Sequence, residues 1–169
     1  MLDIPFEINT KQGIDETYPS SLPAMDVPEF LSRLKGEAYS AEIIDNELII
    51  TADTVVILDD KIYGKPKDEN DAVEMLMQLQ GKTHTVVTGV TITTKEKMES
   101  FSTATEVTFA EISRNEAAWY VTKFKPLDKA GAYGIQEWIG CAAVAGINGS
   151  FYNVMGLPVH QLYKVLKNF

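Results

Sequence analysis

A single carboxylate interrupts a strongly apolar pattern in the stretch ITADTVVILDD, which covers positions 50–60. β-Branched and aliphatic residues flank Asp53 on both sides, and such a run predicts a buried strand. A carboxylate in this position is costly unless it is paired, hydrogen-bonded or bound to a metal ion. Asp53 is therefore either a structural acid satisfied by backbone amides or a functional group, and the pattern leaves both interpretations open.

Two more polar clusters accompany Asp53. In YGKPKD, Lys65 follows a predicted hairpin that begins with the strand of Asp53, so hairpin geometry brings the two residues close together. In KAGAYGIQE, glycines separate Lys129, Tyr133 and Gln136, and glycine backbone permits close approach to a ligand. An exposed turn lysine and ordinary loop packing are the alternative interpretations of these two clusters.

Carboxylates beside lysines suit phosphoryl chemistry. The carboxylate orients or deprotonates a water molecule, while ammonium groups and a metal ion stabilise negative charge on phosphate oxygens. Asp15, Glu16 and Lys35 join this group if the helix that carries Lys35 folds across the sheet. His84 follows a predicted helix end, where it is interpreted as a complement to the helix dipole.

Composition limits the functional classes. The chain has 169 residues, of which 45% are hydrophobic, so it can form one domain over 1–169 with a full core. The net charge of −9 argues against a duplex nucleic-acid partner and suggests that a divalent cation mediates binding of any anionic ligand. Cys141 is the sole cysteine, which excludes an internal disulfide. Without a signal sequence or membrane-spanning run, we expect a soluble cytoplasmic protein with no membrane partner.

The apolar periodicity predicts an α/β protein with a substantial mixed or antiparallel sheet. Helices are expected over 26–41, 68–81, 113–124 and 157–169. Strands are expected over 47–58, 62–64, 83–94 and 99–112, and the stretch 141–154 reads as a strand and turn. Asp68 and the Ser113/Glu116 pair are predicted helix caps.

The segment ADTVVILDDKIYGKPKDENDAVEMLMQLQGKTHTVVTGVTI resembles the central signature of the Maf family of nucleoside triphosphate pyrophosphatases. TATEVTF, DKAGAYGIQ and NGSFYNVMGLP resemble later segments of that family in the same order, so the resemblance covers about positions 3–169. It implies a Maf/ITPase-like fold, in which helices flank a curved mixed sheet. It also implies a house-cleaning hydrolase that converts nucleoside triphosphates to monophosphate and pyrophosphate with Mg²⁺ or Mn²⁺.

The resemblance also implies roles for single residues. Asp53 corresponds to the proton acceptor, and Glu16 to an acid that serves metal or phosphate, so Glu16 and Asp53 are the expected metal ligands. Lys35 and Lys65 correspond to lysines on the phosphate side.

Base specificity is associated with two further positions in the family. They correspond to Thr54 and Gln136, and GAYGIQ is similar to the branch that acts on dTTP and UTP. A glutamine amide can both donate to and accept from a uracil or thymine edge.

One departure from the family pattern lies at the start of the chain. The family normally begins with a strand, an SxSPRR loop and a helix, whereas this sequence resembles it only from LDIPFEI onward. We therefore expect weaker triphosphate binding and an unpaired sheet edge, which a second copy of the chain could cover in a homodimer. The alternative functions are an impaired nucleotide-binding or septum-formation regulator, and a pyrophosphatase for modified or purine nucleotides.

Overall fold

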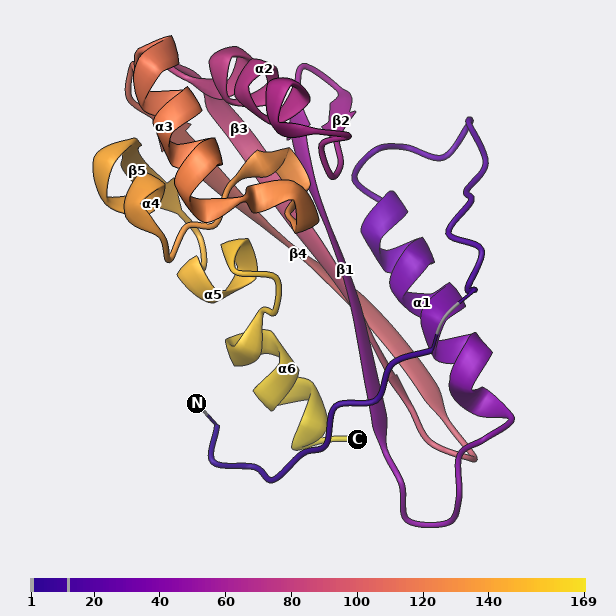
Figure 1. The fold of residues 1–169 in the computed structure, drawn as a ribbon. Coiled ribbons are helices and arrows are strands. Elements are labelled where there is room, and N and C mark those ends of the chain that lie inside the picture. The colour runs from indigo at the N-terminus through magenta and orange to yellow at the C-terminus, as the bar shows by residue number, and fades with distance from the viewer. Residues whose placement is uncertain (1, 12) are drawn as a thin grey trace.

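One antiparallel sheet forms the centre of the computed structural model, which describes residues 2–11 and 13–169 (Figure 1). The strand order is β2-β1-β3-β4-β5, and all four neighbouring pairs are antiparallel. The strands are β1 (Ile49–Leu58), β2 (Lys61–Tyr63), β3 (Thr83–Thr93), β4 (Met98–Phe109) and β5 (Val144–Asn148). The predicted α/β class is confirmed. Within the described residues the sheet contains only antiparallel pairs, which is one of the two arrangements that the apolar periodicity predicted, whereas the family resemblance implied a mixed sheet.

Helices cover both faces of this sheet (Figure 1). On one face lies α1 (Val27–Ser40), whose Val27 and Leu31 pack on Val55, Ile57 and Val87 of the sheet. The other face carries the larger core cluster. The remaining elements are α2 (Glu69–Leu79), α3 (Arg114–Phe124), η1 (Pro126–Asp128), η2 (Ala130–Ala132), α4 (Trp138–Ala142), α5 (Phe151–Val154) and α6 (Val159–Leu166).

Two helices begin at their predicted caps. The Asp68 side chain accepts from the Asp71 N–H at the start of α2, and Ser113 and Glu116 form the reciprocal capping box of α3. No helix in the described part of the chain is both long and apolar enough to cross a membrane.

The stretch 141–154 departs from its predicted strand and turn. Cys141 belongs to the short helix α4, only Val144–Asn148 forms a strand, and Phe151–Val154 forms the one-turn helix α5. The Ser150 side chain accepts a hydrogen bond from the Asn153 N–H, which starts that turn. The cap at Ser150 thus favours a helical turn over the strand that the apolar residues of this stretch predicted.

Two glycines allow α1 to lie unusually close to the sheet. A Cβ on Gly89 of β3 would lie 2.2 Å from backbone atoms of Pro28 and Glu29, and a Cβ on Gly36 of α1 would lie 2.9 Å from the Thr93 hydroxyl oxygen. Gly89 is also the register partner of Asp53 on β1. The closest approach of helix to sheet is therefore beside Asp53.

Strand β1 is only partly covered along one edge. Its short partner β2 pairs with Val56–Leu58 alone. From Ile49 to Val55, β1 has β3 on one side, and none of the described strands pairs with it on the other. Asp53 and Thr54 thus stand on a stretch of strand whose outer backbone edge is open to a ligand.

We predict that Gly89→Ala lowers the free energy of unfolding by at least about 2 kcal/mol, because the added methyl group overlaps backbone and must displace α1. Urea denaturation measures this difference. Gly146→Ala is the matched control, since nothing lies within 4 Å of a Cβ at that strand position. Equal unfolding midpoints for the two variants would contradict the close packing of α1 on β3.

Candidate active site

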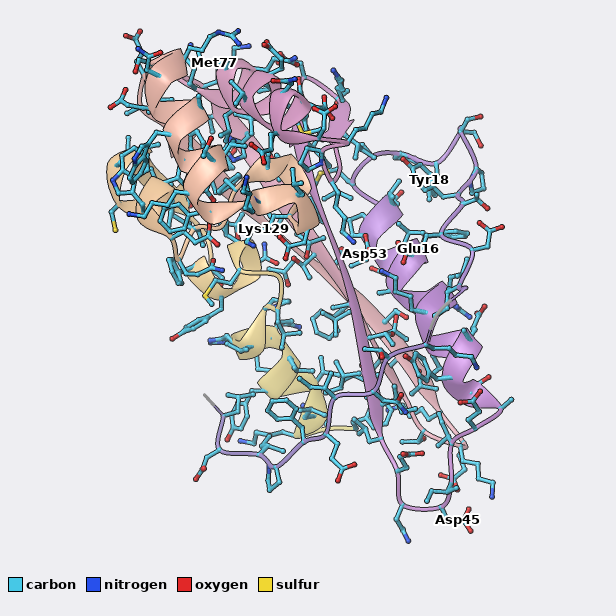
Figure 2. All side chains as sticks on the ribbon, in the orientation of Figure 1. Glu16, Tyr18, Asp45, Asp53, Met77 and Lys129 are labelled. Carbon is cyan, nitrogen blue, oxygen red and sulfur yellow. The ribbon has the colours of Figure 1, made fainter. Side chains whose placement is uncertain are left out.

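Asp53 forms an ion pair with the helix that packs on its face of the sheet. The Lys35 Nζ atom on α1 lies 2.6 Å from Asp53 Oδ1, and the same nitrogen lies 3.3 Å from Glu16 Oε1. Figure 2 shows Asp53 between β1 and α1, and Glu16 beside α1. The side chains of Asp53 and Lys35 are only 13% and 19% exposed, so their pairing is weakly screened by solvent.

Hydroxyl groups fix the helix that carries Lys35. The Thr51 hydroxyl on β1 donates to the Ser32 carbonyl at 2.7 Å, and the Ser32 hydroxyl lies 2.9 Å from that of Thr91 on β3. Both contacts lie within one turn of Lys35 along α1. They hold Lys35 beside Asp53, which follows Thr51 by two residues and points to the same face of the sheet.

Burial and charge act in opposite directions on this pair. Burial raises the pKa of Asp53 above its ordinary value of 3.8, and the hydrogen bond and charge of Lys35 offset only part of that rise. Burial also opposes the charge of Lys35, but its contacts with Asp53 and Glu16 prevail and raise the pKa of the lysine. Lys35 is thus held protonated, and Asp53 is a stronger base than a solvent-exposed aspartate.

A cavity of about 330 Å³ adjoins the pair along the open edge of β1. Thr51 and Ala52 line it from the strand, Lys35 lines it from α1, and Glu16 lines it from the N-terminal segment. That segment is attached to the far end of α1, where the Lys11 ammonium donates to the Ala38 carbonyl at 2.7 Å. Polar and apolar side chains both line the cavity, and Lys35 offers a positive charge there to an anionic ligand.

Lys65 approaches the same centre from beyond β2. Lys65 is exposed. Its positive charge acts to lower the pKa of Asp53, although burial has the larger effect and raises it. The same charge adds to the hydrogen bond from Lys129 in lowering the pKa of Asp128. The preceding residue, Gly64, accepts a hydrogen bond from the Gly131 N–H at 3.1 Å. This bond joins the segment of Lys65 to the glycine-rich loop of residues 129–137.

Thr54 points to the opposite face of the sheet from Asp53, as alternation along a strand requires. Its hydroxyl oxygen lies 2.9 Å from that of Thr88 on β3, and the Thr88 hydroxyl donates to the Asn153 carbonyl at 3.1 Å. A Cβ on Gly156 would lie 3.7 Å from the Thr54 hydroxyl oxygen. The segment after α5 therefore borders Thr54.

Gln136 is exposed on the glycine-rich loop, directly after buried Ile135. No hydrogen bond to its side chain is found among the described residues. A Cβ on Gly131 would lie 2.8 Å from the Val56 side chain, so the loop lies against β1 just beyond Thr54. The amide of Gln136 is thus available to a ligand near that end of the strand.

Buried polar groups hold the glycine-rich loop in place. Burial and the Glu137 hydrogen bond raise the pKa of Tyr120, whose hydroxyl donates to Glu137 and accepts from the Gly134 N–H at 3.0 Å. On the other side, the Tyr133 hydroxyl lies 2.8 Å from Nε2 of His84. Burial lowers the pKa of His84 to about 4, so this ring is a neutral core group, and its interpretation as a complement to a helix dipole was wrong.

The predicted site residues fall into four groups, one of which is exposed Gln136 on the glycine-rich loop. Glu16, Lys35 and Asp53 are in direct contact, Lys65 lies within the range of their charges, and Thr54 lies on the other face of β1. The sequence did not indicate Thr88 and Asn153 as site residues, because they are 65 positions apart in the chain and come together only in the folded structure. The motif NGSFYNVMGLP contained Asn153, but nothing in it indicated a contact with β3.

The carboxylates also bear on metal binding. No group of three or more His, Cys, Asp or Glu side chains suited to a metal ion is found within 2–11 and 13–169. Glu16 and Asp53 converge on one ammonium group and leave their other oxygens available. Mg²⁺ is commonly held by one or two carboxylates together with substrate phosphates, and this pair fits such an arrangement.

We predict that Lys35→Met raises the pKa of Asp53 further, because the effect of burial persists while the opposing hydrogen bond and charge are lost. A base must be deprotonated to act, so the acidic limb of any Asp53-dependent activity moves to higher pH. Carboxyl ¹³C chemical shifts titrated by NMR measure the change. Arg33→Met is the control, since Arg33 is exposed and pairs with Glu37 at 3.2 Å; matching titration curves for the two variants would refute the coupling.

Known proteins resemble this chain over nearly its whole length. The Maf-like protein family model matches residues 1–169. A dTTP/UTP pyrophosphatase of Phocaeicola vulgatus is 54% identical over 166 residues, which are 98% of this chain and 86% of the relative. One from Parabacteroides distasonis is 51% identical over 168 residues, covering 99% of this chain and 87% of the relative. The chain therefore belongs to the Maf family.

Proposed function

We propose that this protein hydrolyses dTTP and UTP to the nucleoside monophosphate and pyrophosphate. The observation that carries the proposal is the Lys35–Asp53 pair on the open edge of β1, in a chain 54% identical to a dTTP/UTP pyrophosphatase. A partly buried carboxylate beside ammonium groups, next to a cavity that Lys35 lines, supplies the parts that hydrolysis of a phosphoanhydride requires.

In this proposal Asp53 orients the attacking water and accepts its proton. The water oxygen forms a bond to the α-phosphorus, and the bond from that phosphorus to the bridging oxygen breaks, which releases pyrophosphate. The raised pKa of Asp53 makes it a better proton acceptor than an exposed aspartate. Placement of water in line with the leaving oxygen accounts for the rest of its contribution.

Lys35 and Lys65 neutralise charge on the triphosphate in this scheme. Lys35 faces the cavity directly, and Lys65 lies at the end where the glycine-rich loop is attached. Glu16 and Asp53 would hold a divalent cation, Mg²⁺ or Mn²⁺, together with the phosphates, and such an ion supplies further charge neutralisation. For a protein of net charge −9, local cations are needed to bind so anionic a substrate.

Thr54 and Gln136 are the proposed base-recognition residues. Thr54 lies one residue beyond Asp53 on the opposite face of β1, and the loop of Gln136 packs on Val56 of the same strand. A nucleotide bound across the open edge would place its phosphates on the face with Asp53 and its base on the face with Thr54. We place this activity in the cytoplasm, where nucleoside triphosphates are made and used.

We predict release of pyrophosphate from dTTP and UTP by the purified chain with Mg²⁺ or Mn²⁺. Asp53→Asn should reduce the rate by at least about 100-fold, because the amide cannot accept the proton of the water. A panel with CTP, ATP and 7-methyl-GTP identifies activity on other nucleotides. Asp45→Asn is the control, since Asp45 is an exposed residue paired only with Lys95 in the described structure.

Three results would contradict this function. Binding of nucleotide by a folded chain without turnover would favour a regulatory protein. Faster turnover of purine or modified nucleotides would change the substrate class. Equal rates for the chain and its Asp53→Asn variant would remove the proposed role of Asp53.

We further infer a homodimer of the nucleotide-free chain, in which a second copy covers the open edge of β1 and must leave it before a nucleotide binds there. An unpaired strand edge is a template for such pairing, and this stretch of β1 has no partner among the described strands. Sedimentation equilibrium at micromolar concentration should give twice the mass of 18.7 kDa. A monomer at that concentration would exclude this mode of association.

A further inference from the structure

A chain of hydroxyl groups runs from Thr54 into the interior of the protein. The Thr54 hydroxyl oxygen lies 2.9 Å from that of Thr88, and the Thr88 hydroxyl donates to the backbone carbonyl of Asn153 at 3.1 Å. Thr88 and Asn153 are fully buried, whereas Thr54 is partly exposed. The chain therefore connects a group at the surface to a backbone atom in the core.

The last member of the chain cannot reorient. The Asn153 side chain donates to the Val86 carbonyl at 3.1 Å and to the Thr105 hydroxyl oxygen at 3.0 Å. A carbonyl accepts only, so the nitrogen of this amide must face Val86. These bonds fix Asn153 on the sheet, and with it the carbonyl that faces Thr88.

The direction of each hydrogen bond follows from counting protons. The Asn153 carbonyl can only accept, so the single hydroxyl proton of Thr88 is used in that bond. Thr88 has no second proton, so Thr54 must donate in the bond between the two hydroxyls. The Thr54 oxygen therefore presents only its lone pairs to a ligand and acts as a hydrogen-bond acceptor.

This fixed polarity distinguishes Thr54 from Gln136. A glutamine amide can rotate to present either its oxygen or its nitrogen, so by itself it does not separate bases whose donors and acceptors are exchanged. Uracil and thymine carry an N–H donor at N3 and a carbonyl at C4, whereas cytosine has a lone pair at N3 and an amino group at C4. A group that can only accept favours the N3–H of the first two bases and repels the N3 lone pair of cytosine.

We propose that Thr88 and Asn153 are positioning residues that hold Thr54 as an acceptor and thereby select pyrimidines with an N3–H group over cytosine. This inference rests on the proposed function in that it places the base of the substrate beside Thr54. It deepens that function by assigning the choice of base to two buried residues on the far side of β1 from Asp53.

The test compares UTP with CTP, which share the sugar and the triphosphate and differ only in the base. Thr88→Val keeps the shape of the side chain but frees the Thr54 proton, which can then be donated to N3 of cytosine. The ratio of kcat/KM for UTP to that for CTP should fall by about tenfold or more. Thr88→Ser, which keeps the hydroxyl, should retain the ratio of the unmodified chain.

Thr91→Val is the control for structural damage. Thr91 is also a fully buried hydroxyl residue of β3, but it bonds to Ser32 and Ser100 on the opposite face. The inference requires an unchanged UTP to CTP ratio in this variant. An unchanged ratio in Thr88→Val, or an equal fall in Thr91→Val, would overturn it.

Binding of UMP and CMP, measured by calorimetry, separates this inference from the proposed activity. If the chain shows no turnover, the proposed function fails, but preferential binding of UMP that Thr88→Val abolishes would still support the role of Thr88. Equal binding of the two nucleotides by the unmodified chain would overturn the inference. If Thr88→Val does not fold by circular dichroism, Thr54→Val replaces it and should weaken UMP binding alone; equal weakening for CMP would overturn the proposal.

Discussion

The ion pair between Lys35 and Asp53 constrains the rest of the structure. The partly buried carboxylate of Asp53 is stabilised by a cation within hydrogen-bonding distance, and that cation comes from α1. The helix reaches it only because Gly89 and Gly36 remove side chains where α1 meets the sheet. The bonds from Ser32 to Thr51 and Thr91 then fix the helix in register. The same contacts therefore pack α1 against this face of the sheet and place Lys35 beside Asp53.

The two faces of the sheet have separate electrostatic characters. Around Asp53 the groups are charged; burial raises the pKa of Asp53, and the contacts of Lys35 with Asp53 and Glu16 raise the pKa of the lysine. Around Thr54 the groups are neutral hydroxyls and amides whose polarity is set by the direction of hydrogen bonds. Because consecutive strand residues point to opposite faces, one strand supplies both environments without bringing a charge near the neutral groups.

Much of this arrangement could be predicted from the sequence. The exceptional position of Asp53 within an apolar run, the hairpin that precedes Lys65 and the capping residues were all visible locally. The contacts of Thr88 with Asn153 and of Tyr120 with Glu137 were not, because they join residues 65 and 17 positions apart in elements whose packing no local pattern specifies. Gly89 appeared as an ordinary strand residue, since its role depends on the helix that passes over it.

The opposite orientations of Asp53 and Thr54 have a consequence for how such a protein can diversify. Substitutions around Thr88 and Asn153 act on one side of the sheet, and the Asp53 carboxylate with Lys35 lies on the other. The thickness of a single β-sheet thus separates the proposed site of hydrolysis at Asp53 from the proposed site of base recognition at Thr54. Such an architecture lets selection alter which nucleotide is removed from the cellular pool while the means of removing it stays intact.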